Sequence, residues 1–190
     1  YCRHIGIPWI CSAWDIPSLE FLRPFNLPMN KIASAMLTHD AFVREVGKEQ
    51  KPTFLSTGLS TLEQVDHALD ILYIAGCHDV TIMHCVGTYP CPESDLNLRM
   101  IPVLAERYPQ YKIGYSGHEA SVSPSVIAAA LGATAIERHI TLDRAMYGSD
   151  QAASLEPKGF QTMVEQIRKV PIVMGDGVKS LQMRRFPSFA

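Results

Sequence analysis

The sequence predicts an α/β fold, specifically a partial (β/α)8 TIM barrel. Short apolar runs alternate with segments of helical character along the chain, which is typical of a parallel sheet covered by helices. No glycine-rich turn follows the first run, so an open nucleotide-binding sheet is disfavoured. With 190 residues and 47% hydrophobic content, the chain can bury one substantial core.

The predicted strands are short apolar runs, as buried parallel strands are. They span Pro8–Ser12, Lys31–Ser34, Pro52–Thr57, Val80–Val86, Lys112–Ser116 and Thr134–Ile140.

The predicted helices follow these runs one by one: Ser18–Arg23, Asp40–Val46, Leu62–Ala75, Leu98–Arg107, Ser123–Leu131 and Lys158–Val170. The third is the best marked. Ser60 and Glu63 have the spacing of a capping box at its start, and Gly76 can adopt the left-handed conformation at its end.

The order βα repeated six times fits strands 3 to 8 of a barrel with their helices. A complete barrel needs roughly 250 residues, and the chain begins in a helix that leads into a strand, so two βα units are expected to be absent in front. Residues 1–178 form the predicted barrel domain, and residues 179–190 form a linker stub or tail.

Charge and hydropathy exclude several classes of protein. The net charge is -2 and no long basic run occurs, so no nucleic acid partner is expected. The apolar stretches are too short for a membrane span. The five cysteines form no C-x-x-C pair and do not resemble a disulfide framework, which favours reduced thiols and a cytoplasmic location.

In a parallel barrel the active site lies at the carboxyl ends of the strands, so the polar residues that close each run are the candidates. Alternation along a strand places Ser116 and His118 on one face, and it does the same for Glu137 and His139. Both histidines are therefore predicted to face the barrel interior.

Two imidazoles from neighbouring strands suit a borderline divalent ion such as Mn, Fe, Co or Zn. The alternative is that one or both are core histidines. Likewise, Lys31 and the serines at the strand ends can orient a phosphate or carboxylate. Their alternative is a lysine that reaches solvent and serines that merely terminate strands.

Several motifs, taken in order, closely resemble the N-acetylneuraminate (sialic acid) synthase family. They are Lys31-Ile32-Ala33-Ser34, Leu55-Ser56-Thr57-Gly58, His84-Cys85, Tyr89-Pro90, Asn97-Leu98-Arg99, Gly114-Tyr115-Ser116-Gly117-His118-Glu119, Glu137-Arg138-His139-Ile140-Thr141-Leu142-Asp143 and Ala153-Ser154-Leu155-Glu156-Pro157. Their order and spacing cover nearly the whole chain.

The resemblance implies roles for individual residues. His118 and His139 correspond to the ligands of a divalent metal, usually manganese. Lys31, Ser34, Ser56 and Ser116 correspond to the phosphoenolpyruvate site, with Lys31 also counted among the catalytic residues. Tyr89 and Asp150 correspond to residues that hold the sugar.

The resemblance also implies a reaction. Phosphoenolpyruvate condenses with N-acetylmannosamine, or a related N-acetylated hexosamine, to give a nonulosonic acid and phosphate. The metal polarises the aldehyde oxygen, the enol carbon attacks the aldehyde carbon, water adds and phosphate leaves. The family is homodimeric and carries a C-terminal antifreeze-like domain, which this chain is expected to lack.

Three positions depart from the family pattern. Met36 stands where many members have a carboxylate, Gly87 where Asn or Ser is usual, and Ala13 where Thr is common.

Two other functions fit the sequence. A Schiff-base aldolase barrel would use Lys31 as its nucleophile and would be trapped by borohydride with substrate. A non-catalytic, truncated remnant of a synthase would keep the motifs without turnover.

Overall fold

A computed structural model gives the structure of the chain and describes residues 1–179. The strands are β1 (Asn30–Ile32), β2 (Thr53–Ser56), β3 (Val80–Cys85), β4 (Lys112–Gly117) and β5 (Ile136–Arg138). The α-helices are α1 (Cys2–Ile5), α2 (Ile16–Leu22), α3 (Asp40–Gly47), α4 (Leu62–Ile74), α5 (Met100–Arg107), α6 (Ser123–Ala130) and α7 (Pro157–Met174).

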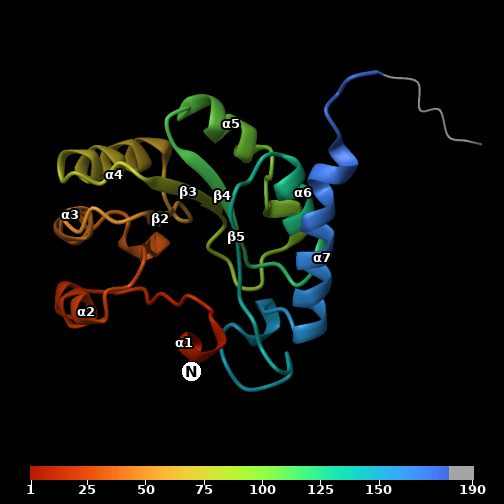
Figure 1. The fold of residues 1–190 in the computed structure, drawn as a ribbon, viewed down its shortest axis with the longest axis horizontal. Coiled ribbons are helices and arrows are strands. Elements are labelled where there is room, and N and C mark those ends of the chain that lie inside the picture. Colours follow the sequence, from red (N-terminus) through yellow and green to blue (C-terminus); the bar gives the residue numbers. More distant parts are fainter. Residues whose placement is uncertain (180–190) are drawn as a thin grey trace, which may run out of the picture.

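The strands form one parallel sheet in the order β1-β2-β3-β4-β5, so each strand pairs with the next one along the chain. Lys31 pairs with Phe54 at one end of the sheet, and Tyr115 pairs with Ile136 at the other. The sheet is curled, and the helices that connect the strands flank it (Figure 1). This arrangement confirms the predicted partial barrel.

The core lies between the sheet and the helices. All six residues of β3 are buried, as the continuous apolar run predicts for a central parallel strand. Ile32, Leu55 and Ile82 on successive strands are fully buried in the same cluster as Phe42 of α3 and Leu72 of α4. The side chains that alternate with this cluster along each strand face the concave side of the sheet.

Helix α4 forms where the sequence predicts it, but its cap differs. Thr61, not Ser60, is the N-cap, and its partner in the capping box is Gln64, not Glu63. Ser60 instead directs its hydroxyl to the carbonyl oxygen of Gly58. Gly76 has φ +95°, as expected for the residue that follows this helix.

One predicted strand is absent from the sheet. Residues 8–12 adopt no regular secondary structure, are mostly exposed and form no ladder with β1. The segment begins with Pro8, which has no amide hydrogen to donate, and Trp9 packs against Phe25 rather than beside a strand. The described part of the chain therefore has five strands, not six.

Helix α7 is longer than predicted. It continues past Pro171, and its last residue is Met174. Gly175, which follows the helix as its C-cap, has φ +62°. A proline removes a single backbone hydrogen bond, and one further turn can form beyond it. No helix within residues 1–179 is both long enough and apolar enough to cross a membrane.

Candidate active site

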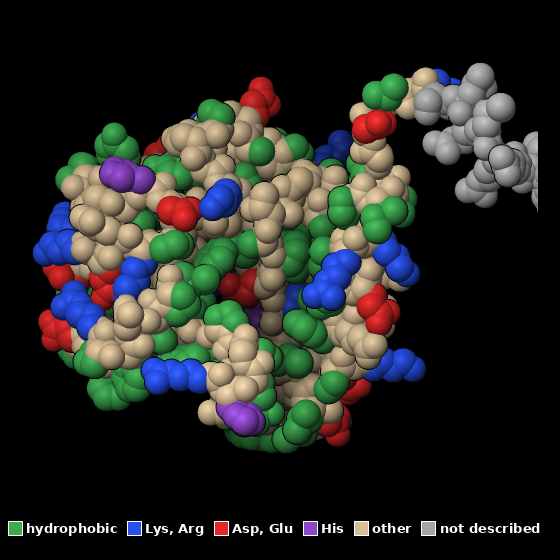
Figure 2. Space-filling view, in the orientation of Figure 1, with side chains coloured by type: hydrophobic (Ala, Val, Ile, Leu, Met, Phe, Trp, Pro, Cys, Tyr) green, Lys and Arg blue, Asp and Glu red, His purple; other side chains and the backbone are tan. Residues whose placement is uncertain are grey.

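A cavity of about 660 Å³ opens on the concave side of the sheet, at the carboxyl ends of the strands. Figure 2 shows a hollow near the centre of the molecule, with acidic and histidine side chains at its floor. All eight candidate residues from the sequence line the cavity: Lys31, Ser34, Ser56, Tyr89, Ser116, His118, His139 and Asp150. They come from all five strands or from the segments that follow them.

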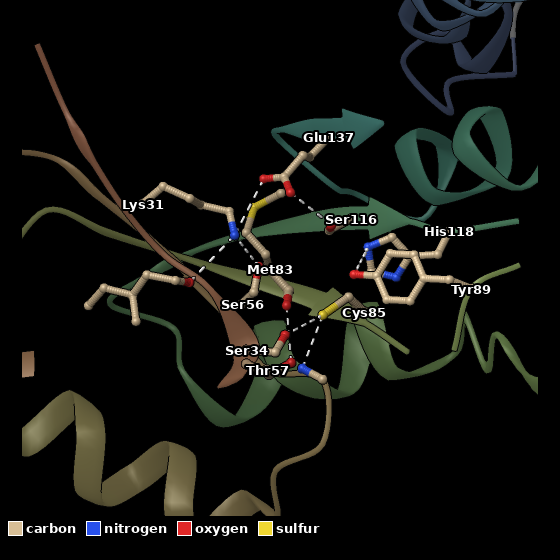
Figure 3. A network of polar contacts seen from close by, with 12 residues as sticks. Lys31, Ser34, Ser56, Thr57, Met83, Cys85, Tyr89, Ser116, His118 and Glu137 are labelled. Carbon is tan, nitrogen blue, oxygen red and sulfur yellow. Dashed lines mark hydrogen bonds and ion pairs between the residues drawn. The ribbon is translucent and has the colours of Figure 1, made fainter. Parts of the chain in front are cut away.

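Lys31 lies at the centre of a polar network in this cavity (Figure 3). Its Nζ donates a hydrogen bond to Ser56 Oγ at 2.7 Å and lies 3.6 Å from Glu137 Oε2. Ser116 Oγ donates to the other oxygen of the same carboxylate at 3.1 Å. Glu137 thus joins the cation of β1 to the hydroxyl of β4. The ammonium group is ion-paired rather than directed to solvent.

A second group of donors lies beside this network. Ser34 Oγ is 3.2 Å from Cys85 Sγ, and the amide of Gly58 donates to the same sulfur at 3.0 Å. A Cβ atom on Gly58 would lie 2.9 Å from both Ser34 Oγ and Cys85 Sγ, so this close approach requires glycine. Hydroxyl, thiol and amide groups are therefore packed around one small volume.

His118 is held in one tautomer by two partners. Its Nδ1 donates to the carbonyl oxygen of Val86 at 2.6 Å, which leaves Nε2 unprotonated. Nε2 accepts the Tyr89 hydroxyl at 2.9 Å. Burial lowers the pKa of His118 below its ordinary value, so the neutral ring is favoured. Burial also raises the pKa of Tyr89 to about 12, so its hydroxyl keeps its proton.

His139 lies beside His118, with the two ring centroids 5.4 Å apart. Asp150 Oδ2 lies 3.6 Å from His139 Nδ1, which is an electrostatic contact longer than a hydrogen bond. Asp150 therefore neighbours a histidine as well as lining the cavity.

The two histidines fit a divalent ion in an open site. Their rings are adjacent, and His118 has the backbone hydrogen bond on Nδ1 that typically orients a metal-binding imidazole. Within residues 1–179, no cluster of three or more His, Cys, Asp or Glu side chains can close a metal site. Further ligands would come from water or substrate, as in catalytic sites. Binding through His118 Nε2 would require the Tyr89 hydroxyl to move.

Glu137 and Cys85 line the cavity but are not among the candidate residues from the sequence. Glu137 was predicted to share a face with His139, and this alternation is the signal that could have identified it. Nothing in the sequence marks Cys85 as a cavity residue, since a cysteine within an apolar run is typical of a buried core position. His84, its neighbour, is buried and contacts the Leu96 carbonyl, as predicted for a core residue.

The three departures from the family pattern lie in different surroundings. Gly87 lines the cavity, and a Cβ there would meet the Leu59 side chain at 2.7 Å. Leu59 thus occupies the space that a larger residue would use. Met36 and Ala13 are buried.

Comparison with known proteins agrees with the geometry. A model of the NeuB family matches residues 1–179. The N-acetylneuraminate-9-phosphate synthase of Drosophila melanogaster is 37% identical over 88% of the chain, and the N,N'-diacetyllegionaminic acid synthase of Campylobacter jejuni is 34% identical over 94%. The match covers 45% and 54% of these relatives, so the chain spans about half their length.

A solved structure shows the same fold. The N-acetylneuraminic acid synthetase of Leptospira borgpetersenii, crystallised with citrate, superimposes with a TM-score of 0.88 at 28% identity. The match covers 95% of this chain and 63% of that one. Since the family model matches almost the whole chain, this protein belongs to the NeuB family.

Proposed function

We propose that the chain carries the catalytic cavity of a nonulosonic acid synthase. In this reaction phosphoenolpyruvate condenses with N-acetylmannosamine, or a related N-acetylated hexosamine, and phosphate is released. The observation that carries the proposal is the convergence of a lysine, three serines and two histidines on one cavity at the carboxyl edge of the sheet.

The half of the cavity around Lys31 suits phosphoenolpyruvate. Lys31 supplies a fixed positive charge, and Ser34, Ser56 and Ser116 supply hydroxyl donors. Together they can neutralise the phosphate or carboxylate and hold the enol carbon in place for attack. Glu137 opposes this charge in the structure, so an incoming anion has to displace its carboxylate from Lys31 and Ser116.

The other half of the cavity suits the aldehyde of the open-chain sugar. His118 and His139 would hold a divalent ion, most suitably Mn²⁺, which supplies a Lewis acid for the aldehyde oxygen when bound. Tyr89 and Asp150 lie next to these histidines and offer a hydroxyl and a carboxylate for sugar hydroxyls. The chain's own contribution is mainly to position both substrates.

The contacts of Lys31 argue against the Schiff-base aldolase. A nucleophilic lysine must lose its proton, and desolvation in an apolar pocket favours that loss. Lys31 instead lies in a polar network, since it donates to the Ser56 hydroxyl and lies 3.6 Å from the Glu137 carboxylate.

Phosphate release tests the proposal. The chain is incubated with phosphoenolpyruvate, N-acetylmannosamine and Mn²⁺, and phosphate and the sugar acid are measured with and without a chelator. We expect release that needs both substrates and is lost on chelation. Turnover that resists the chelator, with borohydride trapping of Lys31, would establish the aldolase instead. Binding of phosphoenolpyruvate without phosphate release would favour the non-catalytic alternative.

A further inference from the structure

A charged pair is buried directly behind the two histidines. Arg138 Nη1 lies 2.8 Å from Glu119 Oε1, and both side chains are 0% exposed. Tyr115 donates its hydroxyl to the other Glu119 oxygen at 2.8 Å. Nothing in the proposed reaction uses these side chains. Removing two charges from water is costly, so the pair is a poor source of stability compared with apolar packing.

The pair is covalently adjacent to both histidines. Glu119 follows His118, and Arg138 precedes His139. The ladder between β4 and β5 ends with Gly117 opposite Arg138, so both histidines lie just beyond the last paired residues. Sheet hydrogen bonds alone therefore do not set the distance between the two imidazoles.

Other contacts hold each histidine separately. The amide of Cys91 donates to the His118 carbonyl, and the amide of Leu155 donates to the His139 carbonyl. These contacts tie the two residues to different loops. The Arg138 side chain, by contrast, joins the segment that follows His118 to the end of β5, which immediately precedes His139.

The guanidinium group is well suited to this connection. Nη1 donates to the Ser121 carbonyl at 2.8 Å and to Ser125 Oγ at 2.9 Å, while Nη2 donates to the Glu119 carbonyl. Its acceptors thus lie in the loop after β4 and in the first turn of α6. A planar group with fixed donor directions can hold these elements in one relative position, whereas a lysine ammonium cannot.

We propose that Arg138 and Glu119 act as a positioning clamp, which holds His118 and His139 at the separation that lets them share one divalent ion. Neither residue touches the ion or the substrates. The inference rests on the proposed metal site. It identifies Arg138 and Glu119, which are adjacent in sequence to the two histidines, as the residues that set the geometry of that site.

The test is metal affinity in the variant Arg138→Lys, which keeps the positive charge and loses the fork of donors. Binding of Mn²⁺ is measured by calorimetry, and the absorption spectrum of bound Co²⁺ reports ligand geometry. Loss of partners behind metal ligands typically weakens binding by about 10- to 100-fold. We expect a fall of that size and a changed Co²⁺ spectrum. The milder variant Tyr115→Phe should weaken binding less.

The chain offers a matched control. Arg107 on α5 contacts Asp66 on α4 at 2.5 Å, and Tyr108 donates to the same carboxylate at 2.6 Å, so this triad has the same chemistry on the surface. Arg107→Lys should leave Mn²⁺ affinity and the Co²⁺ spectrum unchanged. Thermal unfolding of every variant separates lost stability from lost positioning.

The outcomes are distinct. If Arg138→Lys binds Mn²⁺ with wild-type affinity and gives the wild-type Co²⁺ spectrum, the clamp is wrong. The clamp is also wrong if Arg107→Lys weakens Mn²⁺ binding as much as Arg138→Lys does and loses as much thermal stability. If Arg138→Lys does not fold, the same two measurements on Tyr115→Phe replace it, and wild-type Mn²⁺ affinity with a wild-type Co²⁺ spectrum in that variant would overturn the clamp. If the wild-type chain binds no divalent ion, or if His139→Ala binds Mn²⁺ as well as wild type does, the metal site itself is wrong and the clamp falls with it.

Discussion

At the scale of single residues, the charge of the cavity depends on how Glu137 and Lys31 balance each other. Glu137 contacts both Lys31 and Ser116, so it occupies donors that a phosphate would use. While no anion is bound, the Glu137 carboxylate forms an ion pair with the Lys31 ammonium group. The same carboxylate lowers the affinity of the pocket for anions, because like charges repel.

Replacing Glu137 by Gln should therefore strengthen anion binding. We expect affinity for inorganic phosphate to rise by roughly tenfold, since one charge a few ångströms away is worth at most a few kcal/mol near a protein surface. Calorimetric titration with phosphate measures the change. Glu106→Gln, on the exposed side of α5, alters net charge equally and should have no effect. Weaker phosphate binding in Glu137→Gln would mean that the anion pocket lies elsewhere.

The role of His139 is tested by removing its imidazole. His139→Ala should abolish Mn²⁺ binding and metal-dependent phosphate release while the fold stays intact, because the side chain is partly exposed and outside the core. Metal titration and circular dichroism measure the two properties. His67→Ala, at an exposed site on α4, serves as the control. Full metal dependence in His139→Ala would remove this residue from the site.

Two histidines also make stability depend on pH. Burial lowers the pKa of His84 and of His118 below the ordinary value of 6.5, so the unfolded chain takes up protons first as the pH falls. The contribution of these two histidines to the free energy of unfolding should be constant well above pH 6.5 and should decrease below it. The slope should not exceed about 1.4 kcal/mol per pH unit for each histidine.

Urea denaturation at a series of pH values measures this slope. His84→Gln can still donate to the Leu96 carbonyl but does not titrate, so the slope should become shallower in this variant. An unchanged slope would show that His84 does not contribute.

The cavity positions of four residues were predictable from the strand period of two. Ser116 and His118, and likewise Glu137 and His139, were assigned to one face by alternation, and all four line the cavity. Their contacts were not predictable. That Glu137 pairs with Lys31, and that Tyr89 donates to His118, depends on side chains brought together from separate strands.

At the scale of elements, local sequence signals located the helices well and their caps less well. The start of α4 offered two overlapping capping patterns one residue apart, and the structure uses Thr61 with Gln64. A pattern of side-chain types cannot choose between such registers, because the choice depends on where the preceding loop places the backbone.

The two registers give different stability effects. Thr61→Ala removes the cap and should lower the free energy of unfolding by about 1 kcal/mol. Ser60→Ala should change it little, since Ser60 contacts only the Gly58 carbonyl, at 3.5 Å. Chemical denaturation of both variants compares them. A larger loss in Ser60→Ala would favour the predicted box with Glu63.

The predicted strand at residues 8–12 failed for a related reason. An apolar run indicates that a segment can form a strand, but it does not determine whether the segment pairs with a neighbour. Residues 8–12 form no ladder, although β1 pairs with β2 alone in the described residues.

At the scale of the whole molecule, the cavity couples every strand of the sheet. Lys31 belongs to β1, Ser56 to β2, Cys85 to β3, Ser116 to β4 and Glu137 to β5. In the described residues, β1 and β5 each pair with a single neighbour, so the two edges of the sheet are joined across the cavity by side chains rather than by backbone ladders. The contact from Lys31 to Glu137 makes that connection.

A ligand in the cavity should therefore stabilise the sheet as one unit. Mn²⁺ with phosphoenolpyruvate, at 100 times the dissociation constant, should add about 2.7 kcal/mol to the free energy of unfolding, because the ligands bind the folded state alone. Hydrogen exchange should slow in β1 and β5 as well as in the central strands. Lys31→Met, which keeps most of the length of the side chain without its charge, should lose most of this gain. Protection confined to β4 and β5 would mean that only the histidine half of the cavity binds, and the phosphoenolpyruvate site would have to be sought elsewhere.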